Sequence, residues 1–120
     1  AVRAVELGCD GIVVSNHGAR QLDRAPGAIE ALPGIVDAVG DRMTVMLDSG
    51  VQRGSDIVTA LCLGAKFVFV GRATLYGVAA GAVPGAAKAI DILRKEFDLI
   101  MGQIGAPDLS HLGPDYIFKP

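Results

Sequence analysis

His17 and Arg20 lie three residues apart in the polar segment 15–23 (SNHGARQLD), which directly follows the apolar run Gly11–Val14. An imidazole, whose ordinary pKa is ~6.5, removes a proton at neutral pH, and a guanidinium offers two parallel donors to a carboxylate. Together they predict a site for a small acid that loses a proton near its carboxylate. On position alone a second interpretation stays open, in which His17 satisfies backbone groups of its loop and Arg20 forms a surface ion pair.

Two other segments have the composition of a phosphate-binding cradle, and each also follows an apolar run. Glycines permit close approach of the backbone to an anion, arginines add positive charge, and the helix expected near Ser55 points its first amides toward the strand ends. The residues concerned are Gly50, Gly54, Gly71, Arg53 and Arg72. The alternative is that the glycines only form tight turns.

The elements that position these segments are short and strongly apolar. Three runs, at residues 11–14 (GIVV), 44–47 (TVML) and 67–70 (FVFV), are typical of strands buried on both faces, as in parallel sheets. Between and after them the apolar periodicity predicts helices over residues 27–39, 56–63 and 86–101. Pro33 and Gly34 are expected to delay or interrupt the first of these helices, and Ser55 is expected to be the N-cap of the second.

An internal repeat supports this order of elements. The segment 7–14 (LGCDGIVV) matches the segment 63–70 (LGAKFVFV), each time as a helix end, a glycine and a strand. Repeated β/α units predict a parallel α/β sheet, either an open doubly wound sheet or a closed (β/α)8 barrel. Three strands alone would leave unpaired edges, and the segment 1–7 (AVRAVEL) has the pattern of a helix already under way. We therefore expect an upstream segment of the same protein to complete the sheet.

Composition excludes several classes of protein. The chain has 51% hydrophobic and 20% charged residues, enough for a packed core, and its net charge of −2 without basic runs argues against nucleic-acid binding. Cys9 and Cys62 are too few for a disulfide framework, which favours a cytoplasmic location. His17, Asp23, Asp48 and His111 show no metal-ligand spacing, so no metal is expected.

Three segments, GIVVSNHGARQLD, LDSGVQRGSDIVTALCLGA and VFVGRATLYG, resemble the signature segments of the FMN-dependent 2-hydroxy acid oxidase and dehydrogenase family. That family includes glycolate oxidase, flavin-type lactate dehydrogenase and mandelate dehydrogenase. The sequence of the tail, APDLSHLGPDYI, is most similar to that of bacterial mandelate dehydrogenase. The resemblance implies that residues 1–105 are strands six to eight of a TIM barrel with a C-terminal helix, and that residues 106–120 form an extended tail.

The resemblance also implies roles for individual residues. His17 corresponds to the catalytic base, which also contacts substrate, and Arg20 to the residue that binds the substrate carboxylate. Residues matching the flavin-binding segments are Asp48, Ser49, Gly50, Val51, Gln52, Arg53, Gly71 and Arg72. The family usually has two adjacent arginines where this chain has Gln52 and Arg53. Loss of one charge-assisted hydrogen bond is expected to weaken FMN binding by about 1–3 kcal/mol.

The implied activity is oxidation of a 2-hydroxy acid, mandelate or lactate among the candidates, to a 2-oxo acid with FMN as cofactor. Hydride and carbanion versions of the reaction stay open, as does the oxidant: oxygen, a quinone or a cytochrome. The implied assembly is a homo-tetramer, cytoplasmic or peripheral to the inner face of the membrane. Residues 1–120 alone are expected to be inactive, because the family's lysine at the flavin ring and its substrate tyrosines lie upstream. A structural piece without catalysis, or another phosphate-binding barrel such as an isomerase, are the competing hypotheses.

Overall fold

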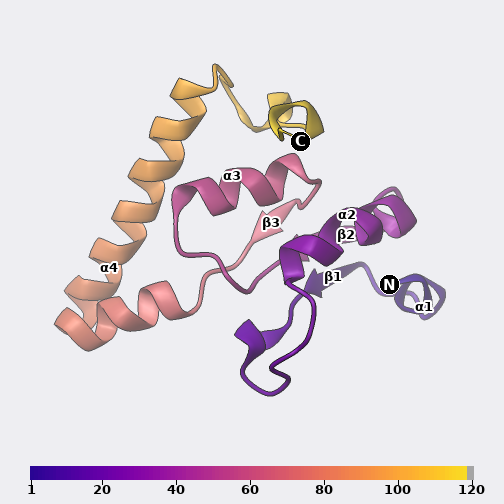
Figure 1. Cartoon of the computed structure of the whole chain (residues 1–120), viewed down its shortest axis with the longest axis horizontal. Helices are drawn as coiled ribbons and strands as arrows, with labels where there is room; N and C mark the ends of the chain where they lie inside the picture. Colours follow the sequence, from indigo (N-terminus) through magenta and orange to yellow (C-terminus); the bar gives the residue numbers. More distant parts are fainter. Residues whose placement is uncertain (119–120) are drawn as a thin grey trace.

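A computed structural model describes residues 1–118 and contains one parallel sheet flanked by helices (Figure 1). The strands β1 (Gly11–Val14), β2 (Thr44–Leu47) and β3 (Phe67–Val68) pair in the order β1-β2-β3. Both pairings are parallel, with Gly11 opposite Thr44 and Met46 opposite Phe67. The first two strands confirm the predicted bounds. The third is shorter than predicted, although the Phe69 amide still donates to the Leu47 carbonyl at 2.9 Å.

Each strand leads into a helix, so the chain consists of three consecutive β/α units. The helices are α1 (Val2–Glu6), α2 (Ala28–Val39), α3 (Gly54–Cys62) and α4 (Arg72–Gln103), with short 3-10 turns η1 (His17–Ala19), η2 (Leu109–His111) and η3 (Pro114–Tyr116). Strands that are neighbours in sequence are also neighbours in the sheet. This sequential order is that of a barrel wall, whereas a doubly wound sheet reverses its order at a switch point.

The main core lies between the sheet and helix α2. Leu32 and Val39 of α2 and Val45 and Leu47 of β2 are at most 1% exposed, and they are the largest fully buried side chains. Full burial of an aliphatic side chain of this size is worth about 1.5–3 kcal/mol. The core therefore fixes β2, and with it the start of the loop that follows Leu47.

The expected interruption of α2 at Pro33 and Gly34 is wrong, because the helix runs without a break from Ala28 to Val39. A proline in a helix removes one backbone donor. Here the burial of Leu32 and Val39 on the sheet holds the helix, and tertiary packing outweighs local propensity.

Helix α3 begins earlier than predicted, and Ser55 is not its N-cap. The N-cap is Arg53, and the Asp56 carboxylate accepts hydrogen bonds from the amides of Gln52 and Arg53 at 2.9 Å each. An acidic side chain in the first helical turn satisfies amides that have no partner within the helix. Asp56 thus sets the start of α3, and the helix ends at Cys62.

Helix α4 is also longer than the predicted helix over residues 86–101. It has two pieces that meet at a sharp bend, visible in Figure 1, where Gly81 and Ala82 leave the helical conformation. The Cβ that any other residue would place at Gly77 or Gly85 would collide with the backbone of the other glycine. The two pieces therefore pack closely at this glycine pair, which local periodicity did not reveal.

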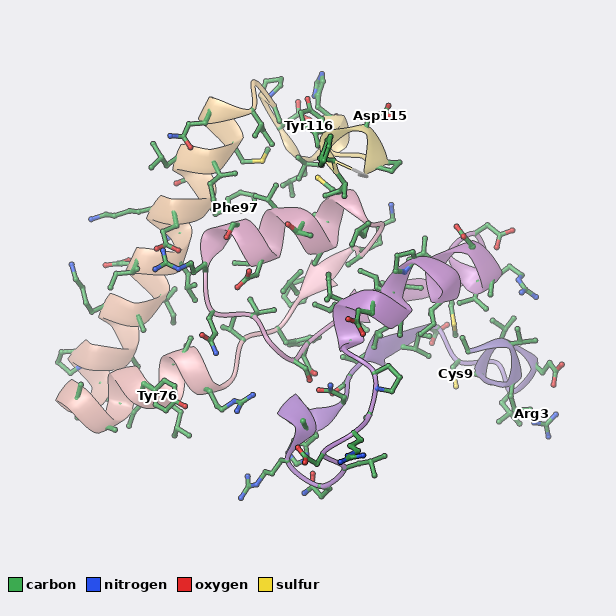
Figure 2. The ribbon with its side chains drawn as sticks, viewed as in Figure 1. Arg3, Cys9, Tyr76, Phe97, Asp115 and Tyr116 are labelled. Carbon is green, nitrogen blue, oxygen red and sulfur yellow. The ribbon has the colours of Figure 1, made fainter. Side chains whose placement is uncertain are left out.

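A second apolar cluster joins α3, the end of α4 and the tail. Its buried members are Val58, Cys62, Met101 and Ala106, and Leu112 and Ile117 pack against them. Figure 2 shows Phe97 on the side of α4 that faces α3. Burial raises the pKa of the Cys62 thiol, whereas Cys9 is exposed and does not pack as expected. Residues 106–118 thus form an ordered extension on the helices, and the boundary of the tail at residue 105 stays a prediction.

Both edges of the sheet expose large apolar side chains. Val13 on β1 is 42% exposed, and Phe67 and Phe69 at β3 are 55% and 43% exposed. Unpaired strand edges and exposed apolar faces favour association with other chains. Within residues 1–118, no helix is both long and apolar enough to cross a bilayer.

Expressed alone, residues 1–120 are expected to give aggregated or molten material that binds no FMN, because nothing covers these edges. Size-exclusion chromatography, near-ultraviolet circular dichroism and FMN titration check this. A monomer that unfolds cooperatively would contradict it, because three strands would then suffice.

Candidate active site at the carboxyl ends of the strands

The loops that follow the three strands meet around one cavity of about 740 Å³. This volume lies in the range of ligand and cofactor sites. Two of the predicted site residues, Arg53 and Gly54, do not line it. The predicted residues that do are His17, Arg20, Asp48, Ser49, Gly50, Val51, Gln52, Gly71 and Arg72. The predicted catalytic pair and the predicted flavin segments thus share one space, as expected for the carboxyl ends of parallel strands.

The histidine loop, residues 15–20, has a strained backbone. His17, Gly18 and Ala19 have φ angles of 55°, 62° and 59°, three left-handed residues in succession. The left-handed region costs a residue with a Cβ about 1–2 kcal/mol, and only Gly18 avoids this cost. Such strain persists only where surrounding contacts enforce the conformation.

Side chains of the loop itself form some of the hydrogen bonds that hold this conformation. The Ser15 Oγ accepts a hydrogen bond from the His17 amide at 3.1 Å, and the Asn16 Oδ1 accepts one from the Ala19 amide at 3.2 Å. The Asn16 Nδ2 also donates to the Pro26 carbonyl at 3.1 Å, which ties the loop to the segment before α2. Ser15 and Asn16 therefore shape the loop, although the sequence assigned them no role.

Ser49, in the loop after β2, forms the other hydrogen bonds that hold the histidine loop in this conformation. Its Oγ accepts hydrogen bonds from the amides of Gly18 at 3.0 Å and Asn16 at 3.3 Å, and it donates to the Asp48 Oδ1 at 2.7 Å. Ser49 itself has a φ of 75°, also left-handed. The second loop thus holds the first from both sides of His17.

Arg72, at the start of α4, connects the third loop to the histidine loop. Its Nη2 donates to the Gly18 carbonyl at 3.3 Å. A Cβ at Gly18 would lie 2.5 Å from the same nitrogen, so this position requires glycine for space as well as for its φ angle. Arg72 therefore lines the cavity and contacts the histidine loop from one position.

The two helix starts near the cavity differ in what they offer an anion. The amides of Gln52 and Arg53 donate to Asp56, and the Gly54 amide donates to the Glu96 Oε2 at 2.9 Å. These three amides are therefore already used by carboxylates, and the expectation that the first amides of α3 point toward a phosphate stays a prediction. Arg53 also turns away from the cavity, with its Nη1 3.4 Å from the Glu96 Oε1.

The first backbone amides of α4, unlike those before α3, are free to bind an anion. Within residues 1–118, the amides of Arg72, Ala73 and Thr74 have no hydrogen-bond partner, as is usual for a first helical turn. Within residues 1–118, and leaving aside the chain neighbours of each glycine, no atom lies within 4 Å of the position that a Cβ would take at Gly50 or Gly71. Free amides, open glycines and the Arg72 guanidinium together fit a phosphate group.

The histidine of the tail lies away from this site. The His111 Nδ1 is 3.0 Å from the Asp108 Oδ1, and hydrogen bonds from Ser110 and His111 lower the pKa of Asp108 to about 2. Within the described residues, no three His, Cys, Asp or Glu side chains gather as a metal site would require. The pair therefore adds nothing to the cavity chemistry.

A family model described as FMN-dependent dehydrogenase matches residues 1–119. The chain belongs to this family of FMN-dependent dehydrogenases. It is 57% identical over 115 residues to an FMN-dependent alpha-hydroxy acid dehydrogenase of Penicillium citrinum, covering 96% of this chain and 29% of that protein. It is 47% identical over 117 residues to (S)-mandelate dehydrogenase of Pseudomonas putida, covering 98% of this chain and 29% of that protein.

Solved structures of the family share the fold of this chain. A monotopic membrane protein, (S)-mandelate dehydrogenase, superposes with a TM-score of 0.93 at 46% identity, covering 98% of this chain and 31% of that one. The three β/α units are thus the C-terminal part of a (β/α)8 barrel, as predicted. The chain spans under a third of the length of these relatives. FMN is the cofactor of the family.

Proposed function

We propose that this chain carries the catalytic loop and the flavin phosphate site of an enzyme that oxidises a 2-hydroxy acid to a 2-oxo acid. The observation that carries the proposal is the single cavity shared by His17, Arg20 and the Gly71-Arg72 turn. A proton acceptor, a carboxylate-binding cation and a phosphate cradle in one space match the needs of this reaction.

FMN fits the residues at the start of α4. Arg72 and the first amides of this helix would hold the phosphate, while Gly50 and Gly71 leave room for the cofactor to approach the backbone. When bound, FMN accepts the two electrons released by oxidation of the substrate. Gln52 lines the cavity beside this cradle and offers an amide where a second arginine would offer charge.

Arg20 and His17 have different roles toward the substrate: Arg20 binds its carboxylate and His17 removes a proton. Arg20 holds the carboxylate through paired hydrogen bonds, which fixes the neighbouring carbon in the cavity. His17 takes one proton from the substrate, either the hydroxyl proton in the hydride version of the reaction or the α-proton in the carbanion version. The organic product is the 2-oxo acid, two electrons and two protons poorer than the substrate.

The test is a panel of 2-hydroxy acids given to the complete FMN-loaded protein with an artificial electron acceptor. Mandelate, lactate and glycolate represent the substrates named among the relatives. Formation of the matching 2-oxo acid from at least one of them supports the proposal. Failure of every 2-hydroxy acid, with FMN bound, would refute it.

The rest of the active site belongs to a segment that completes the barrel. We place this segment upstream in the same protein, because the edge of β1 and its exposed Val13 need a neighbouring strand. The assembly we propose is a homo-tetramer in the cytoplasm or on the inner face of the membrane. Membrane attachment of the monotopic relative supports the second location.

Arg72→Met is expected to raise the dissociation constant of FMN by about 10- to 100-fold, because a hydrogen bond to a charged group contributes about 1.5–3 kcal/mol. Arg53→Met is the matched control, since the Arg53 side chain is 73% exposed and paired with Glu96. Its expected effect is less than about fivefold, in keeping with an exposed ion pair. Fluorescence titration of FMN checks both, and equal effects would contradict the assignment of the phosphate to Arg72.

A further inference from the structure

Protein groups occupy every hydrogen-bonding position of the Ser49 hydroxyl, so none is free for a cofactor. A serine hydroxyl offers one donor and two acceptor lone pairs. The donor is used by Asp48, and the two acceptor positions are used by the amides of Asn16 and Gly18. The Ser15 Oγ, at 3.4 Å, is a further neighbour within hydrogen-bond distance. The family resemblance placed Ser49 among the flavin contacts, but its side chain is directed to the histidine loop.

The amides that Ser49 binds belong to the residues immediately before and after His17. His17 is an exposed residue in a left-handed conformation, so burial does not hold it in place. The serine is 31 residues away in sequence from Gly18 and lies on the loop after β2, whose core residue Leu47 is 1% exposed. Its hydrogen bonds therefore anchor the strained histidine loop to the buried end of β2.

We infer that Ser49 is a positioning residue that fixes the orientation of His17 toward the substrate. This inference rests on the proposed function, because it gives Ser49 a role only through His17. Asp48 has a part in the same arrangement, since its carboxylate accepts the hydrogen bond that the Ser49 hydroxyl donates, which leaves both lone pairs of the Ser49 oxygen for the loop amides. The role differs from flavin binding and is separable from it by experiment.

The experiment uses Ser49→Ala and Ser49→Gly in the complete FMN-loaded protein. Alanine removes the hydroxyl and keeps the strain of the φ angle of 75°, whereas glycine removes the hydroxyl and relieves that strain. Both variants are expected to reduce flavin with substrate about 10- to 100-fold more slowly, the usual effect of a misplaced reacting group. The dissociation constant of FMN is expected to change by less than about threefold.

A double-mutant cycle with His17→Gln separates positioning from a general structural effect. If Ser49 acts through His17, Ser49→Ala slows the reaction in the parent and adds nothing in the His17→Gln background. An equal loss in both backgrounds, a normal rate in both Ser49 variants, or loss of FMN with a normal rate at saturation would each overturn the inference. A normal rate in His17→Gln alone would instead contradict the proposed function.

Discussion

Replacing His17 with glutamine is expected to slow reduction of the bound flavin by a 2-hydroxy acid by about 10²–10⁴-fold, the usual contribution of a general base. Glutamine is similar in size and keeps hydrogen-bonding groups, but its amide does not accept a proton at neutral pH. The loop is expected to keep its shape, because its hydrogen bonds come from Ser15, Asn16 and Ser49 rather than from the imidazole. FMN is expected to remain bound, since the phosphate cradle that we propose lies at the start of α4, away from the imidazole.

Stopped-flow absorbance of the flavin band under anaerobic conditions measures this rate. His111→Gln is the matched control, because it makes the same substitution at a histidine in the tail, paired with Asp108 and outside the cavity. Its rate should equal that of the parent. A near-normal rate in His17→Gln would remove His17 from its role and restore the interpretation in which it only satisfies its own loop.

Replacing Arg20 with lysine is expected to lower kcat/KM by about 100-fold, although the charge is kept. A guanidinium matches both oxygens of a carboxylate with two parallel donors, whereas an ammonium group is a single point charge on a flexible stem. The substrate would bind more weakly and in less uniform orientations, so KM should rise and kcat should fall. A loss confined to KM would show that Arg20 contributes binding without orientation.

Steady-state kinetics with the preferred 2-hydroxy acid check this expectation. Arg24→Lys is the matched control, since Arg24 is an exposed arginine four residues further along the chain and does not line the cavity. Parent-like kinetics in Arg20→Lys would place Arg20 in a surface ion pair, which is the other interpretation of its position.

The sequence predicted the parts of this molecule that local patterns determine. The apolar runs at β1 and β2 predicted the bounds of both strands. The expectation that the strands are buried on both faces is not met within residues 1–118, where Val13 of β1 is 42% exposed. The site followed from the same pattern, since loops at the carboxyl ends of parallel strands converge. This convergence brings His17, Arg20 and Arg72 to one cavity.

The features that the sequence did not predict depend on contacts between distant residues. The first piece of α4 packs against the second where Gly77 approaches Gly85, and glycines carry no helical periodicity. The interaction of Glu96 with Gly54 spans 42 residues, and that of Ser49 with Gly18 spans 31. The adjacent polar residues Ser15 and Asn16, before a histidine, were the only local signal of the loop geometry.

The central claim is that this cavity couples oxidation of a 2-hydroxy acid to reduction of FMN. Anaerobic titration of the complete FMN-loaded protein with the preferred 2-hydroxy acid tests it most directly, with flavin absorbance and 2-oxo acid measured in the same sample. Because the oxidation releases two electrons and FMN accepts two, we expect one molecule of 2-oxo acid for each flavin that is bleached. A flavin that stays oxidised in the presence of each 2-hydroxy acid, or one that is bleached without formation of 2-oxo acid, would contradict it.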